Sequence, residues 1–305
     1  MSDLEIKEVR SRRELRDFIY LPGMVHKNDK KWLPPLYADE WALYNPKKNK
    51  SFKHTDTILY VAYRQGRPVG RIMGLIHRLY NQIHNERHAR FAFIESFNDR
   101  EVVHSLLSKA EEWARGHGMV KIVGPLGFSD KDPQGLVVSG FDAPRFFTSA
   151  TNDPYLPELV AAEGYTKKVD LVNYLLPIPE RLPEVYNRML ERFRNSGNVR
   201  VVEFENKKQL RPYILPVLEV MNQTYMEIYG YYPLDDEEKK DLASRYLPVL
   251  DPHFIKVILC GDDVAAFAVA MPDPSEGIRK AGGKLLPFGI FHILREIKRT
   301  DILLT

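Results

Sequence analysis

The chain has 305 residues, of which 44% are hydrophobic and 28% charged, and its net charge at pH 7 is +3. This length predicts about two domains, and this charge is too small for a dedicated nucleic-acid-binding domain. No apolar stretch reaches the ~18–20 residues that cross a bilayer, and the charged N-terminus differs from a signal peptide. We therefore expect a cytoplasmic protein with no nucleic-acid or membrane partner. The single cysteine, Cys260, excludes an internal disulfide and lies in an apolar run, which predicts a buried, inert thiol.

The first half alternates strand and helix patterns. A short strand at 5–9 precedes helical sequence from Ser11, and residues 58–76 alternate as a β-hairpin that turns at Gln65-Gly66-Arg67. A strand at 91–94 leads into a helix whose apolar residues recur at helical spacing from 102 to 114, and a strand follows at 120–123. The lysine-rich segment 45–54 follows several aromatic residues. This pattern can hold single-stranded nucleic acid, but we favour a solvated loop anchored by its aromatic side chains.

The second half repeats this order. A strand at 199–204 precedes a helix at 207–229, despite Pro212 and Pro216, and a second hairpin follows at 254–270. Gly66, Val69 and Gly70 of the first hairpin match Gly261, Val264 and Ala265 of the second. A proline-rich linker with a short helix separates the halves. The expected domains are therefore 1–176 and 199–305, joined by the linker 177–198.

This order resembles the GNAT superfamily of N-acetyltransferases, and the chain is similar to an uncharacterised bacterial GNAT-like group. The matching residues are Lys31–Leu36, Gly66–Ile72, Glu111–Trp113, Gly124-Pro125, Gln134–Leu136 and Gly140–Asp142, with a closing strand–helix–strand at Pro154-Tyr155, Glu163–Tyr165 and Asp170-Leu171. The resemblance implies an α/β (α+β) fold of two tandem GNAT-like domains, each a mixed twisted sheet flanked by helices. The second domain would be incomplete, because Thr300–Thr305 begins its fourth strand. The implied cofactor is acetyl-CoA or another acyl-CoA.

GNAT domains bind the cofactor pyrophosphate with an Arg/Gln-x-x-Gly-x-Gly/Ala turn at a helix start, where backbone N–H groups and the helix dipole favour anions. The corresponding turn here, Ser96–Glu101, contains no glycine. Asn98 and Glu101 have the spacing of a capping box, which would occupy the same N–H groups, and Asp99 adds negative charge. We therefore identify no cofactor-binding residue in this chain and expect the activity in the second domain, with a glycine-bearing turn beyond Thr305.

Two further patterns are weaker. Gly277–Lys284 differs in spacing from a phosphate-binding loop, and Leu285 stands where Ser or Thr is required, so we expect a flexible surface loop before a helix at 288–295. His84 and His88 have zinc-ligand spacing, but Asn85 replaces the glutamate of the metalloprotease pattern. We expect a solvated loop there and no metal site.

Acyl transfer to an amine needs a base and a proton donor. GNAT enzymes often use Glu and Tyr, and the resemblance makes Glu95 and Tyr155 the candidates in the first half, with Tyr165 as a second tyrosine that we expect in the core. The acceptor pocket is expected on a tyrosine-rich segment of the second half, formed by Tyr225, Glu227, Tyr229, Tyr231 and Tyr232. The resulting hypothesis is an acyl-CoA-dependent N-acyltransferase of a small-molecule amine. The alternative is a non-catalytic GNAT-like binding or scaffold protein.

Overall fold

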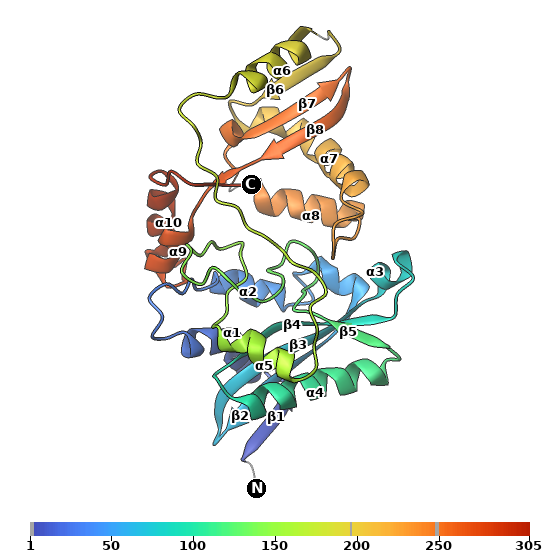
Figure 1. The fold of residues 1–305 in the computed structure, drawn as a ribbon, viewed down its shortest axis with the longest axis vertical. Helices are drawn as coiled ribbons and strands as arrows, with labels where there is room; N and C mark the ends of the chain where they lie inside the picture. Colours follow the sequence, from blue (N-terminus) through green and yellow to red (C-terminus); the bar gives the residue numbers. More distant parts are fainter. Residues whose placement is uncertain (1–2, 196, 248–249) are drawn as a thin grey trace. The chain divides into compact units, whose positions relative to one another are not determined.

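The computed structural model describes residues 3–195, 197–247 and 250–305. The chain divides into two compact units, each built from several segments, which Figure 1 colours along the sequence. Unit 1 consists of Met1–Lys168, Ile228–Tyr232 and Asp273–Thr300; unit 2 consists of Val169–Glu227, Pro233–Pro272 and Asp301–Thr305. The domain boundaries expected at 176 and 198 stay predictions.

Unit 1 contains a five-stranded mixed sheet in the order β1-β2-β3-β4-β5. Neighbouring strands are antiparallel except β4 and β5, which are parallel and joined by a helix. The strands are β1 (Leu4–Glu8), β2 (Thr55–Arg64), β3 (Arg67–His77), β4 (His88–Ser96) and β5 (Lys121–Val123). Each lies where the alternating or apolar sequence predicted a strand. The order of elements is that of the GNAT fold.

Helices α1 (Arg12–Val25) and α4 (Arg100–Gly116) pack on opposite faces of this sheet (Figure 1). The other helices of unit 1 are α2 (Tyr37–Leu43), η1 (Lys50–His54), α3 (Arg78–Ile83), α5 (Tyr155–Ala162), α9 (Ser275–Ala281) and α10 (Gly289–Ile297). Ala62 packs with Leu106 of α4 in one core, whereas its neighbour Val61 packs with Phe18 of α1 in the other. Successive strand residues point to opposite faces, so the alternating sequence supplies both cores. Each fully buried leucine or phenylalanine contributes about 1.5–3 kcal/mol.

Unit 2 contains a three-stranded antiparallel sheet in the order β6-β7-β8. Its elements are α6 (Glu184–Asn195), β6 (Val199–Glu203), α7 (Lys207–Thr224), α8 (Asp236–Tyr246), η2 (Pro252–Phe254), β7 (Ile255–Cys260), β8 (Asp263–Val269), β9 (Met271–Pro272) and β10 (Leu303–Leu304). The predicted helix with two internal prolines is α7, which ends at Thr224 and not at Tyr229. A strand also forms near Thr305, where β10 pairs with β9.

The predicted repeat is confirmed by topology, because both units contain a strand, then helices, then a hairpin in this order. Each hairpin also has an irregularity shortly after its turn: the pairing skips Val69 in unit 1 and Ala265 in unit 2. The proposed residue match is therefore wrong by one position, since Val69 corresponds to Ala265 and not to Val264. Both turns have two residues, and the first of each, Gln65 or Gly261, has a positive φ.

Two local predictions are wrong. Residues 275–281 form helix α9 and not a loop, because Ile278 packs with Leu33 and with Ile293 of α10. The expected closing strand after α5 is absent: none of the described residues 166–178 is in a strand. Much of this apolar run is exposed. An alternating apolar and polar sequence forms a strand only where it can pair with the edge of a sheet.

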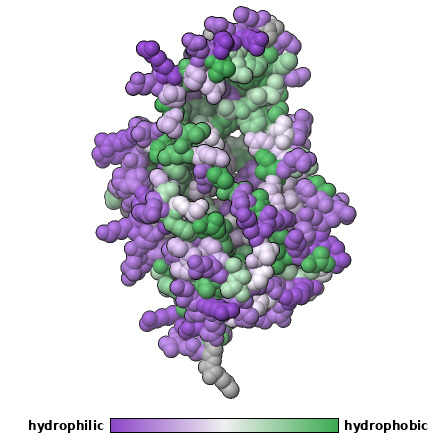
Figure 2. Space-filling view, in the orientation of Figure 1, coloured by the Kyte–Doolittle hydropathy of each residue, from purple (hydrophilic) through white to green (hydrophobic). Residues whose placement is uncertain are grey.

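Polar and charged side chains cover much of the face in Figure 2, and apolar groups lie among them. None of the helices in the described parts of the chain has the length and apolar character needed to cross a membrane.

Candidate functional site

The candidate site lies in unit 1, where β4 leaves its parallel neighbour. The pairing of β4 with β5 ends at Arg90 and Val123, and one further bond joins Leu126 N–H to the carbonyl of Phe91. β4 is then distorted: its register with β3 shifts between Arg71 and Met73, and Phe93 has a φ of 51°. A bulge of this kind re-aims the following side chains. Glu95 is the acid that follows it.

Glu95 is buried and pairs with a histidine. Its side chain is 8% exposed, and Oε2 lies 3.1 Å from Nε2 of His26, which is fully buried. Its second oxygen, Oε1, is also buried and has no hydrogen-bond partner among the described residues. A buried carboxylate normally satisfies both oxygens, so the free Oε1 is a candidate contact for a ligand.

His26 lies at the C-terminal cap of α1, and three groups surround its ring. The ring stacks on Trp32 at 5.6 Å, Nε2 faces Glu95, and Nδ1 lies 3.4 Å from Oδ2 of Asp153. Burial alone would lower the pKa of His26, but the hydrogen bond to Glu95 and the charges of Glu95 and Asp153 raise it above its usual value. This pairing could not be found from the sequence, since no residue near His26 in the chain points to Glu95.

Tyr155, the first residue of α5, lies at the same end of β4. Its hydroxyl donates to the carbonyl oxygen of Ser96 at 2.7 Å. Burial, followed by the charges of Asp153 and Glu95, raises the pKa of Tyr155, so its phenol stays protonated. The structure therefore brings the two predicted catalytic candidates, Glu95 and Tyr155, together. Tyr165 packs against the core beside α4, in agreement with the core position expected for it. Its hydroxyl donates to Glu111 at 3.0 Å.

The turn that opens α4 is closed by a different residue from the one predicted. The N-cap is Asp99, whose Oδ1 accepts from the N–H groups of Glu101 and Val102. Arg64 lies 2.8 Å from Asp99 and 2.7 Å from Glu101. The predicted capping box of Asn98 and Glu101 is wrong because the helix begins one residue later. An acid occupies two backbone donors at this turn.

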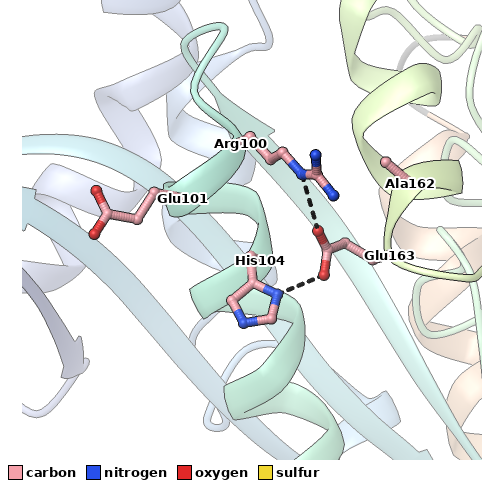
Figure 3. Close-up of a pocket in the computed structure, with 5 residues that line it drawn as sticks. All are labelled: Arg100, Glu101, His104, Ala162 and Glu163. Carbon is pink, nitrogen blue, oxygen red and sulfur yellow. Dashed lines mark hydrogen bonds and ion pairs between the residues drawn. The ribbon is translucent and has the colours of Figure 1, made fainter.

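A shallow pocket of about 550 Å³ lies beside this turn, between α4 and the end of α5 (Figure 3). Arg100, Glu101, His104, Ala162 and Glu163 line it. Glu163 lies 2.5 Å from Nδ1 of His104 and 4.0 Å from Nε of Arg100, as the dashed lines show. Because Glu163 already pairs with both Arg100 and His104, these two side chains are poorly placed to hold an anion.

The predicted acceptor segment is divided between the two units. Tyr229, Tyr231 and Tyr232 belong to unit 1, whereas Tyr225 and Glu227 belong to unit 2. The buried Tyr232 ring lies 4.2 Å from that of His77, and Lys168 lies 4.9 Å above the ring of Tyr229.

In unit 2, the ring of Tyr225 lies 6.3 Å from Phe267, and Glu227 is exposed. The assignment of these tyrosines and Glu227 to an acceptor pocket stays a prediction.

The remaining candidates are placed as follows. His84 caps the C-terminus of α3, and His88 begins β4, so they do not share one helix face. The predicted solvated loop is partly wrong, because α3 occupies its beginning. Cys260, the last residue of β7, is exposed. The prediction of a buried thiol is therefore wrong, because Cys260 ends the strand and is exposed although the residues before it are apolar.

No protein-family model matches the chain. Over 299 residues it is 31% identical to the bacterial ceramide synthase of Caulobacter vibrioides (strain NA1000 / CB15N), a match that covers 97% of this chain and 77% of that protein. Over 293 residues it is 23% identical to the protein YghO of Escherichia coli (strain K12), covering 96% and 74% of the two chains.

Solved structures of similar fold include a tandem GNAT protein from the clavulanic acid biosynthesis pathway, with a TM-score of 0.47, 13% identity, and 88% and 74% of the two chains covered. An aminoglycoside acetyltransferase, meta-AAC0020 from an uncultured soil metagenomic sample, has a TM-score of 0.35 and 11% identity, with 58% of this chain and 97% of the other covered. These scores are low, and the order of strands and helices carries the assignment of a tandem GNAT-like fold. By sequence, the chain belongs to the family of the bacterial ceramide synthase of Caulobacter vibrioides.

Proposed function

We propose that the chain is an acyl-CoA-dependent N-acyltransferase whose acceptor is the primary amine of a long-chain amino alcohol. A ceramide is a fatty acyl amide of such an amine, and a relative with 31% identity over 97% of this chain is a ceramide synthase. The structural observation that supports the proposal is Glu95, a buried carboxylate with one unpartnered oxygen among the described residues, where two parallel strands part.

The chemistry is direct transfer. The amine nitrogen attacks the thioester carbonyl carbon, and a C–N bond forms as the C–S bond breaks. Glu95 Oε1 takes the proton that the amine loses, while Oε2 stays bound to His26. Tyr155 is the candidate donor of a proton to the leaving thiolate, and backbone N–H groups on the distorted part of β4 are candidates for polarising the carbonyl. Glu95 then releases its proton to water and Tyr155 takes one up, which returns both groups to their starting states.

In unit 1, Asp99 occupies two N–H groups at the start of α4, and Glu101 adds negative charge there. This turn is therefore unsuited to the cofactor's diphosphate. Glu95 and Tyr155 are the catalytic candidates that unit 1 offers, and the active site that the sequence predicts in the second copy is the alternative within this proposal.

The test is incubation of the protein with a long-chain acyl-CoA and a long-chain amino alcohol, with mass spectrometry of the lipid product. We expect an amide and one equivalent of free thiol. The matched control is the N,N-dimethylated acceptor, which has the same chain but cannot form a neutral amide. Thiol release that is equal with both acceptors would contradict amide formation. Neither turnover nor binding of acyl-CoA by calorimetry would instead support the non-catalytic alternative.

A further inference from the structure

The second ring nitrogen of His26, Nδ1, has no role in the proposed acyl transfer. Nε2 faces Glu95, so Nδ1 points to the opposite side of the ring, where Oδ2 of Asp153 lies 3.4 Å away. Nδ1 is buried and makes no hydrogen bond within the described residues. The histidine as a whole is 2% exposed. Imidazole nitrogens are common metal ligands, so a buried ring nitrogen that faces a carboxylate without a hydrogen bond is a candidate ligand.

A second carboxylate completes the cluster. His26, Asp29 and Asp153 each offer one ligand atom, and these atoms all lie within 4.8 Å of one another. An ion held at ~2.0–2.2 Å from each ligand needs separations of no more than about 4.4 Å, which small side-chain rotations supply. The side chains of Asp29 and Asp153 are 26% and 28% exposed, so an ion can reach them from solvent.

The contact of the other ring nitrogen, Nε2, is also typical of a histidine that binds a metal. A histidine that binds a metal through one nitrogen normally donates its other N–H to a carboxylate, which fixes the tautomer. Glu95 stands in that position, 3.1 Å from Nε2. One positive group opposes an ion, because Nη1 of Arg145 donates to Oδ2 of Asp29 at 2.7 Å. The ion would therefore share Asp29 with Arg145 and with the backbone N–H of Lys31, which donates to Oδ1 at 2.8 Å.

We propose that His26 Nδ1, Asp29 and Asp153 form a binding site for one divalent transition-metal ion of the zinc class. Imidazole and carboxylate ligands suit such ions, and three protein ligands leave a coordination position open for water or a ligand. Binding would displace the proton from Nδ1. This inference is independent of the acyl-transfer proposal, since metal binding is measured without turnover.

The test is calorimetric titration of the metal-free protein with Zn²⁺, with the visible spectrum of the Co²⁺ form as a second readout. We expect one equivalent to bind with micromolar or tighter affinity. Asp153→Asn, which is isosteric and only half-buried, is expected to weaken binding at least tenfold, and Glu95→Gln to weaken it about 10–100-fold through its effect on His26. His84→Gln, which removes a surface histidine, is the matched control and should bind like the parent.

One variant separates metal binding from loss of folding. Arg145→Gln removes the positive charge beside Asp29, so Zn²⁺ should bind more tightly, a gain that unfolding cannot produce. The proposal is overturned if the protein binds no stoichiometric ion, if Asp153→Asn binds as tightly as the parent, or if His84→Gln loses the ion.

Discussion

Nε2 of His26 and Oε2 of Glu95 lie 3.1 Å apart, although 69 positions separate the two residues in the chain. α1 supplies the imidazole and β4 the carboxylate. The pairing orients Glu95 through one oxygen and leaves the other without a hydrogen bond in the described structure. This division between a held oxygen and a free one is the reason for proposing Glu95 as the base.

Glu95→Gln removes the base and keeps the size of the side chain. If Glu95 takes the amine proton, the rate of amide formation should fall by roughly 10²–10⁴-fold. The measurement is kcat with the long-chain acceptor. Glu112→Gln is the control, since Glu112 is exposed on α4 and pairs only with Lys109 in the described structure. A folded Glu95→Gln protein with the parent's kcat would exclude this role.

The start of α4 gives a direct comparison of two neighbouring residues. Asp99→Ala removes the oxygen that accepts from the N–H groups of Glu101 and Val102, so the free energy of unfolding should fall by about 1 kcal/mol. Asn98→Ala should change it by less than about 0.5 kcal/mol, because Asn98 is exposed and is not the cap. Urea unfolding measures both. A larger effect for Asn98→Ala would restore the capping box predicted from the sequence.

This pair also shows where sequence reasoning is limited. Periodicity identified the hairpin at 58–76 and the helix after β4, because both patterns are local and each residue's face follows from its position. The exact cap differed by one residue, since Asn98 and Asp99 are both good caps and packing selects between them. The pairing of His26 with Glu95 could not be predicted, because it depends on where α1 packs against β4. Helix α9 was missed for the same reason: contact with α10, and not its own sequence, stabilises it.

We expect the free energy of unfolding to depend on pH because of the buried His77. Burial, followed by the charges of Arg90 and His54, lowers its pKa to about 3. The unfolded chain takes up a proton below pH ~6.5, whereas the folded protein does not, so stability falls as the pH drops. Between pH 7 and pH 5 this group should cost about 2 kcal/mol.

The matched variant is His77→Asn. The Nδ1 of His77 accepts from the N–H of Tyr80 at the start of α3, and asparagine can replace it as a cap without titrating. Urea unfolding at the two pH values should show a smaller difference for His77→Asn than for the parent. An unchanged difference would mean that other groups control the acid sensitivity.

Close packing of β3 against α4 depends on Gly70. A Cβ at this position would lie 2.4 Å from Cγ1 of Val102 and 2.8 Å from Cδ1 of Leu106. Gly70→Ala should therefore reduce the free energy of unfolding by about 1–3 kcal/mol, because strand or helix must shift. Gly116→Ala is the control: no atom lies within 4 Å of its added Cβ, so we expect no loss. Equal effects of the two substitutions in thermal unfolding would contradict this packing.

Cys260 should react with a thiol reagent in the folded protein. It is the last residue of β7, its side chain is exposed, and its Sγ lies 3.4 Å from Nδ2 of Asn198. We therefore expect Ellman's reagent to titrate one thiol without denaturant, at a rate close to that of the unfolded chain. Cys260→Ser supplies the blank, because the chain has no other cysteine. Reaction only after unfolding would instead restore the buried thiol that the apolar sequence predicted.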